Sequence, residues 1–134
     1  MINRYSRKEI KDIWEDYNKY SIWVNIELAA AEAMEKLKII PKGVSKKIRS
    51  KAKINVKRIL QIEEKVKHDV IAFLTSISEK AGKETRHLHK GMTSSDVLDT
   101  CFNLQLKQSG QIILRDIDQL LTSLKLQAIK HKYT

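Results

Sequence analysis

Residues 87–100 carry the densest group of side chains in this sequence that could do chemistry. Two histidines, a glycine and the hydroxyl residues Thr93, Ser94 and Ser95 lie at or just before the start of a predicted helix there. Gly91 lets the backbone turn sharply toward a ligand, and Ser94 can cap the helix that follows. Free amides at a helix start bind carboxylates and phosphates. The segment therefore predicts an anion site, with a histidine-containing loop and an ordinary capped helix as the alternative.

A second polar cluster, Lys67, His68 and Asp69, places a cation, an imidazole and a carboxylate at another predicted helix entrance. His68 can serve there as a hydrogen-bond partner or proton relay for an anionic substrate. The alternative is structural, since Asp69 can simply cap the helix while His68 donates to it.

Arg4 and Tyr5 form a third cluster, just ahead of the first predicted helix. A guanidinium fork beside a phenol can bind a phosphate group. A surface arginine on a frayed terminus is the alternative.

The four histidines do not form a recognisable zinc ligand set, because no paired cysteines accompany them: His68, His87, His89 and His131. The sequence also has no glycine-rich phosphate loop and no serine-hydrolase elbow. We therefore predict that the protein uses no metal and no cofactor.

The elements that would hold these clusters are all helical, because the sequence has only four glycines and one proline. Ser6 and Glu9 form a capping box that predicts a helix to about Leu37, with both tryptophans on its buried face. Further helices are predicted over residues 44–51, 56–66 and 70–80, and from Ser94 or Ser95 to about Lys130. Asp69 is the predicted N-cap of the 70–80 helix, and Gly82 is predicted to end it.

The long last helix divides the predicted all-α fold into an amino-terminal helical domain, residues 1–93, and the start of a central helical bundle, residues 94–134. Its apolar positions extend beyond what one neighbouring helix covers, for example Val97, Cys101, Leu104, Ile113, Ile117, Leu120 and Leu124. We therefore expect the chain to oligomerise or to continue beyond Thr134.

The net charge of +10 is spread along the chain and indicates a solvated basic surface more than a nucleic-acid site. A basic helical module that binds nucleic acid or another helix remains the alternative, and steeply salt-dependent binding would support it. Cys101 lies on an apolar helical face and is predicted to be a small core residue. No signal peptide or membrane span is evident, so we expect a cytoplasmic protein without membrane or nucleic-acid partners.

The three clusters, in this order and at these positions, resemble the amino-terminal part of the adenylosuccinate lyase family, in the fumarase/aspartase superfamily. The resemblance covers essentially the whole chain and includes residues 3–6, 39–41, 67–73, 89–97 and 130–134. It implies a homotetrameric C–N lyase that acts by β-elimination in purine synthesis. Its substrates would be adenylosuccinate, which gives AMP and fumarate, and the succinylcarboxamide ribonucleotide. Argininosuccinate lyase, in the same superfamily, is the nearest alternative.

The resemblance also implies roles for single residues. Arg4 and Tyr5 would contact the nucleotide phosphate, and Thr93 and Ser94 the succinyl or fumarate portion. The substrate site would be lined by Lys67, His68 and Asp69, with His68 and His89 as supporting catalytic histidines.

Two departures from the family pattern limit what this chain can do. Position 67 is more often arginine in the family, so Lys67 would bind as a point charge. The family's proton-donating histidine, in a Gly-Arg-Thr-His motif, and its catalytic serine are expected beyond Thr134. We therefore expect this chain to be inactive alone.

Overall fold

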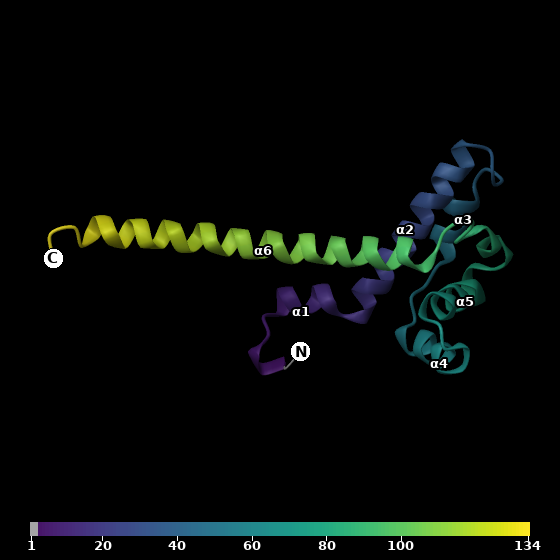
Figure 1. Ribbon diagram of the computed structural model, residues 1–134, viewed down its shortest axis with the longest axis horizontal. Coiled ribbons are helices and arrows are strands. Elements are labelled where there is room, and N and C mark those ends of the chain that lie inside the picture. The colour runs from purple at the N-terminus through teal and green to yellow at the C-terminus, as the bar shows by residue number, and fades with distance from the viewer. Residues whose placement is uncertain (1–2) are drawn as a thin grey trace.

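Helices make up the regular structure throughout the computed structural model, which describes residues 3–134 (Figure 1). Within that range no strand is present, so the predicted all-α fold is confirmed. In chain order the elements are the 3-10 helix η1 (Asn3–Tyr5), α1 (Lys8–Trp14), α2 (Asp16–Lys36), α3 (Val44–Lys51), α4 (Val56–Val66), α5 (Asp69–Ala81), the 3-10 helix η2 (Lys83–His87) and α6 (Ser94–Lys130).

The single helix predicted from Ser6 to Leu37 is wrong, because the chain breaks at Glu15. Arg7 is the N-cap of α1, and Glu15 is extended between α1 and α2, with φ −72° and ψ 146°. The Ile13 carbonyl beside the break accepts amide hydrogen bonds from Asn18 (2.8 Å) and from Gln105 of α6 (2.7 Å). The Gln105 side chain, from a distant helix, thus helps to satisfy the carbonyl group exposed at the break. This tertiary contact leaves no signal in the local sequence.

The core lies where α2, α3, α4, α5 and the start of α6 meet. Trp23 is its largest side chain, only 1% exposed, and makes edge contacts with Tyr20 and Phe73 at ring separations of 5.2 and 5.3 Å. Aliphatic residues complete this core, including Leu28, Ile48, Ile59, Val70, Ile77 and Val97. Cys101 is buried there as predicted, and burial raises the pKa of its thiol.

The prediction that both tryptophans belong to the core is correct for Trp23 and wrong for Trp14. Trp14 is 38% exposed, lies edge-on to Phe102 at 6.1 Å, and donates its indole N–H to Ser109 (3.1 Å). Tyr17 and Leu37, which are also apolar positions of the predicted helix, are exposed as well. Trp14 lies nine residues before Trp23, about 180° away on a continuous helix, and the turn at Glu15 directs α1 along α6.

The central helices match their predicted bounds closely. α3 and α4 occupy residues 44–51 and 56–66 as predicted, and α5 ends before Gly82, which has φ +81°. The predicted cap of α5 is wrong, because its N-cap is His68 and Asp69 is already helical. The imidazole Nδ1 of His68 accepts the hydrogen bond from the backbone N–H of Ile71 (3.4 Å).

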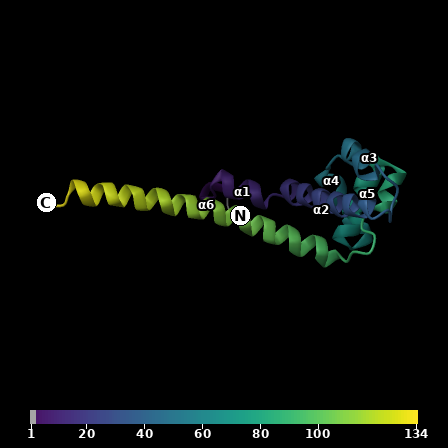
Figure 2. The same ribbon diagram turned by 90° about the horizontal axis from the view of Figure 1, so that it is seen from above.

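The last helix, α6, is 37 residues long and extends as an arm far beyond the other helices in both views (Figures 1 and 2). At 1.5 Å per residue it measures about 55 Å. Its N-cap is Thr93 rather than the predicted Ser94, and Thr93 forms a capping box with Asp96. Nowhere in residues 3–134, α6 included, is there a helix whose length and apolar character would let it span a membrane.

Candidate functional site

His89 is the most firmly held of the residues predicted to form the site. Its ring Nδ1 lies 2.7 Å from one carboxylate oxygen of Glu27, and its backbone N–H donates to the other oxygen, also at 2.7 Å. Glu27 lies in the middle of α2 and is only 1% exposed. A buried carboxylate therefore fixes both the ring and the backbone of His89, and these contacts join residues that are 62 positions apart.

Glu27 is a functional candidate that the sequence interpretation missed. It lies four residues after Trp23 and four before Ala31, so helical spacing places it on the buried face of α2. A carboxylate on a buried helix face is rare unless it is paired. The position of Glu27 on the buried face was the signal that could have identified it. Its partner, His89, could not be named without the fold.

Backbone conformation sets two of the predicted site residues apart. Outside glycine, the described residues with positive φ are Lys38, Lys67 and His89. Left-handed backbone is uncommon for residues with a side chain and is concentrated at functional sites and helix ends. Lys67 is the C-cap of α4, two residues before α5 begins, while His89 lies two residues before Gly91, which has φ +71°. Both polar clusters thus lie on sharp turns that open into a helix.

The two helix starts present different groups to a ligand. At α5, His68 and Asp69 already accept hydrogen bonds from the amides of Ile71 and Val70. At α6, the Asp96 carboxylate accepts from the backbone N–H of Thr93 (2.8 Å), and the hydroxyl residues at 93–95 surround the helix end. The start of α6 therefore has more hydroxyl groups than the start of α5 with which to bind a carboxylate or phosphate.

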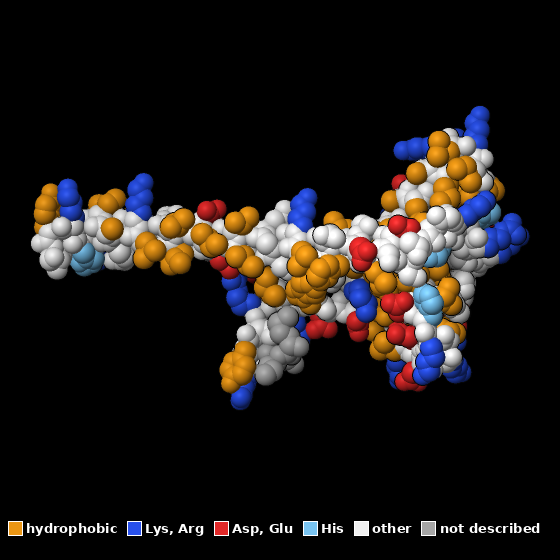
Figure 3. Space-filling model, viewed as in Figure 1, with side chains coloured by type: hydrophobic (Ala, Val, Ile, Leu, Met, Phe, Trp, Pro, Cys, Tyr) orange, Lys and Arg blue, Asp and Glu red, His pale blue; other side chains and the backbone are white. Residues whose placement is uncertain are grey.

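The helix starts of α5 and α6 are anchored on one core, because Val70 and Val97, each in a first helical turn, are both fully buried in it. Histidine side chains gather on the visible face of this part of the molecule (Figure 3). In the described part of the chain, no hydrogen bond or ion pair links residues 67–69 with residues 89–94. The binding roles of these residues stay predictions.

Arg4 and Tyr5 lie apart from the other two clusters. Both views place the amino-terminal segment beside the middle of α6, away from α4 and α5 (Figures 1 and 2). The Arg4 guanidinium lies 4.7 Å from the centre of the Tyr5 ring, and that ring is 74% exposed. Within a single chain the fold does not bring these residues to the histidines.

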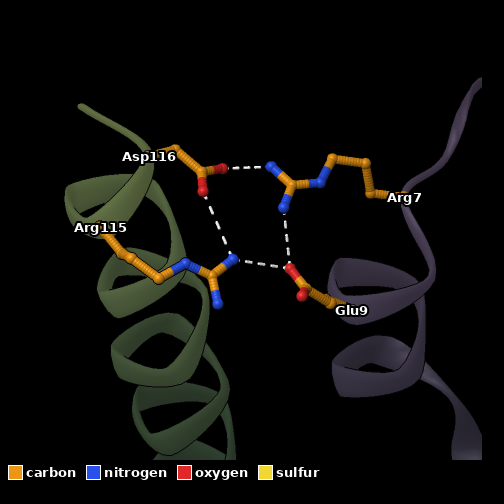
Figure 4. A network of polar contacts seen from close by, with 4 residues as sticks. All are labelled: Arg7, Glu9, Arg115 and Asp116. Carbon is orange, nitrogen blue, oxygen red and sulfur yellow. Dashed lines mark hydrogen bonds and ion pairs between the residues drawn. The ribbon is translucent and has the colours of Figure 1, made fainter. Parts of the chain in front are cut away.

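Four charged side chains hold the amino-terminal segment against α6 (Figure 4). Glu9 accepts hydrogen bonds from Arg7 and from Arg115, both at 2.8 Å, and Asp116 pairs with Arg7 and with Arg115. The hydrogen bond from Arg7 lowers the pKa of Asp116, and that from Arg115 lowers the pKa of Glu9. This network holds the start of α1, directly after η1, against α6.

We expect the carboxyl groups of Glu9 and Asp116 to titrate below their ordinary pKa values in the folded chain. Lowered pKa values mean that the ion pairs stabilise the fold above the ordinary carboxyl pKa, and that this contribution is lost as the pH falls through the lowered values. Carboxyl ¹³C NMR across an acid titration measures both midpoints. Arg115→Gln should raise the midpoint of Glu9, whereas Arg49→Gln, which removes a distant ion pair with Glu32, should leave it unchanged. Equal Glu9 titration midpoints in the parent and in Arg115→Gln would contradict the proposed effect of Arg115 on Glu9.

No group of three or more histidine, cysteine, aspartate or glutamate side chains is arranged to hold a metal ion in residues 3–134. The hydroxyl, amide, lysine and imidazole groups of these clusters can bind anions, and the imidazoles can transfer protons.

Comparison with known proteins places this arrangement in a family. A family model described as a lyase matches residues 3–134. All 134 residues align at 42% identity with adenylosuccinate lyase from Bacillus subtilis (strain 168), of which the chain covers 31%. The crystal structure of a fumarate lyase from Mesorhizobium sp. BNC1 superposes with a TM-score of 0.84 at 25% identity, over 94% of this chain and 31% of that one.

The chain thus spans about a third of the length of each of these two relatives. The family match nevertheless runs through every element of the fold, from η1 to the end of α6. The polar clusters at 4–5, 67–69 and 89–94 all fall inside the matched range. We conclude that this chain belongs to the lyase family.

Proposed function

We propose that this chain forms the amino-terminal part of an adenylosuccinate lyase. The complete protein would split adenylosuccinate into AMP and fumarate, and the succinylcarboxamide ribonucleotide into its carboxamide and fumarate, in purine synthesis. The observation that carries the proposal is the 42% identity to an adenylosuccinate lyase, which extends over all 134 residues. The likeness to a fumarate lyase structure is consistent with fumarate as a product.

The proposed reaction is a β-elimination. A base removes a proton from the carbon beside a succinyl carboxylate, the electron pair forms the double bond of fumarate, and the C–N bond breaks. An acid then protonates the departing nitrogen. Because negative charge develops on the carboxylate, hydrogen-bond donors aimed at it lower the barrier. Thr93 and Ser94 at the start of α6 would supply such donors, and Lys67 would add a positive charge.

The remaining residues complete this assignment. His68 and His89 would assist proton transfer or bind the substrate, Asp69 would line the site, and Arg4 with Tyr5 would bind the nucleotide phosphate. The principal acid and base would lie outside these 134 residues, so we expect the chain alone to show no lyase activity.

A site assembled from several subunits would reconcile this assignment with the position of Arg4 and Tyr5. The amino-terminal segment that carries them lies beside the middle of α6, so a second copy of the chain could present them to residues 67–69 or 89–94. We propose a homotetramer in the cytoplasm for the complete protein, with the exposed apolar side chains of α6 in the subunit contacts.

The test is an assay of fumarate release by the complete protein with adenylosuccinate, and with argininosuccinate for comparison. We expect activity on adenylosuccinate only. Ser94→Ala should lower kcat/KM about 10- to 100-fold, because a hydrogen bond to a charged group contributes about 1.5–3 kcal/mol.

Ser123→Ala is the matched control for Ser94→Ala. It removes a serine hydroxyl from the same helix, one that donates to the Gln119 carbonyl (3.0 Å), and should leave kcat/KM unchanged. Release of fumarate from argininosuccinate alone would overturn the proposed substrate, and equal losses in the two variants would overturn the role of Ser94.

A further inference from the structure

We propose that Glu27 is a positioning residue that keeps a proton on Nδ1 of His89 and so directs the lone pair of Nε2 to the substrate. This inference rests on the proposed function, because it assumes that His89 borders the site. Glu27 itself does not contact the substrate, because its side chain is only 1% exposed. It acts through His89.

The geometry of the pair fixes the tautomer. An ionised carboxylate only accepts hydrogen bonds, and both oxygens of Glu27 are engaged: one with the backbone N–H of His89 and one with its ring Nδ1. With Glu27 ionised, Nδ1 carries the proton in this contact. In the neutral ring, Nε2 is then an acceptor, and in the protonated ring it becomes a donor to an anion.

His68 has the opposite arrangement. Its Nδ1 lies 3.5 Å from an Asp69 carboxylate oxygen and accepts a hydrogen bond from the backbone N–H of Ile71 (3.4 Å). While Nδ1 accepts that hydrogen bond, a neutral His68 carries its proton on Nε2. The two histidines assigned to the site thus present unlike groups, an N–H on His68 and a lone pair on His89. Only the second of these depends on a buried carboxylate from another helix.

A purely structural role is the competing explanation. Glu27 also holds the backbone of His89 in its left-handed conformation, with φ +55°, and could do nothing more than tie the 88–93 loop to α2. The two explanations differ in what happens to the ring when the carboxylate becomes an amide.

Glu27→Gln separates them because the backbone N–H of His89 cannot be anything but a donor. The amide oxygen of the substituted side chain must face that N–H, which turns the amide NH₂ toward Nδ1. Nδ1 then has to accept, so the proton moves to Nε2. We expect long-range ¹H–¹⁵N NMR of the chain labelled with ¹⁵N-histidine to show His89 as the Nδ1–H tautomer in the parent and as the Nε2–H tautomer in Glu27→Gln.

Glu35→Gln is the matched control on the same helix. Glu35 accepts hydrogen bonds from the backbone N–H groups of Gly43 (2.9 Å) and Ser45 (2.6 Å), with no histidine involved. The variant loses an acceptor as Glu27→Gln does, so it should lower stability while leaving the His89 tautomer unchanged. An unchanged His89 tautomer in Glu27→Gln would overturn the inference.

The complete protein supplies the second readout. Glu27→Gln should lower kcat for adenylosuccinate roughly 10- to 100-fold, the loss found when the partner that orients a metal-binding histidine is removed, while Glu35→Gln keeps the parent kcat. A reversed tautomer with unchanged kcat would overturn the positioning role. If the parent protein does not cleave adenylosuccinate, the proposed function fails, and the positioning role fails with it. The tautomer result then still decides whether Glu27 sets the ring of His89.

Discussion

Trp23→Ala is expected to lower the free energy of unfolding of this chain by about 3–5 kcal/mol, the usual cost of deleting a buried tryptophan or phenylalanine side chain. Trp23 is 1% exposed and is enclosed by Tyr20 and Phe73, which are themselves stacked at 5.9 Å. The alanine removes the ring shared by both edge contacts and leaves a cavity between α2 and α5. Urea unfolding followed by far-UV circular dichroism measures the change.

Trp14→Ala is the matched control, since it removes the same type of side chain from α1, the helix that precedes α2. Trp14 is 38% exposed and has one ring contact and one hydrogen bond, so we expect a loss of about 1 kcal/mol. If Trp23→Ala is too unstable to fold, Trp23→Phe gives a smaller measurable loss. Equal losses for the two alanine variants would show that the aromatic core is assigned incorrectly.

The two tryptophans also show where sequence periodicity stops being informative. Both were assigned to one buried face, but they are nine residues apart, which places them about 180° from each other even on a continuous helix. The extended residue Glu15 rotates α1 away, and the carbonyl at this break is satisfied by Gln105, which is 92 positions from Ile13. The short helices α3 and α4 were predictable because Pro41, Gly43 and the caps that bound them act locally.

The same distinction applies to the candidate site. The turns at residues 67–69 and 89–94 were predictable, because glycine, hydroxyl and acidic residues at helix starts act on their own backbone. The pairing of His89 with Glu27 was not, since it needs α2 and the loop before α6 to meet. The separation of Arg4 and Tyr5 from the histidines likewise depends on the path of α1 along α6.

The apolar face of α6 changes side along the helix, which the sequence interpretation missed. Leu104 and Ile113 were assigned to one stripe, but nine residues at about 100° each place them about 180° apart. Val97 and Cys101 face the core, whereas the later apolar residues follow an exposed line at spacings of four, seven, four, three and four: Phe102, Leu106, Ile113, Ile117, Leu120 and Leu124, each at least 45% exposed. Such spacing is typical of a coiled-coil seam.

The double substitution Ile117→Lys and Leu124→Lys is therefore expected to abolish self-association of the chain. These side chains are 45% and 56% exposed on the arm of α6, where hydrophobic groups line the surface (Figure 3). A contact that buries them in a second copy cannot accommodate two unpaired charges. Sedimentation velocity should show an oligomer for the parent and a monomer for the variant. Gln119→Lys with Thr122→Lys adds the same charge to the other side of α6 and should remain oligomeric. A parent chain that sediments as a monomer at high concentration would rule out this seam, because its exposed apolar line would then need no second copy.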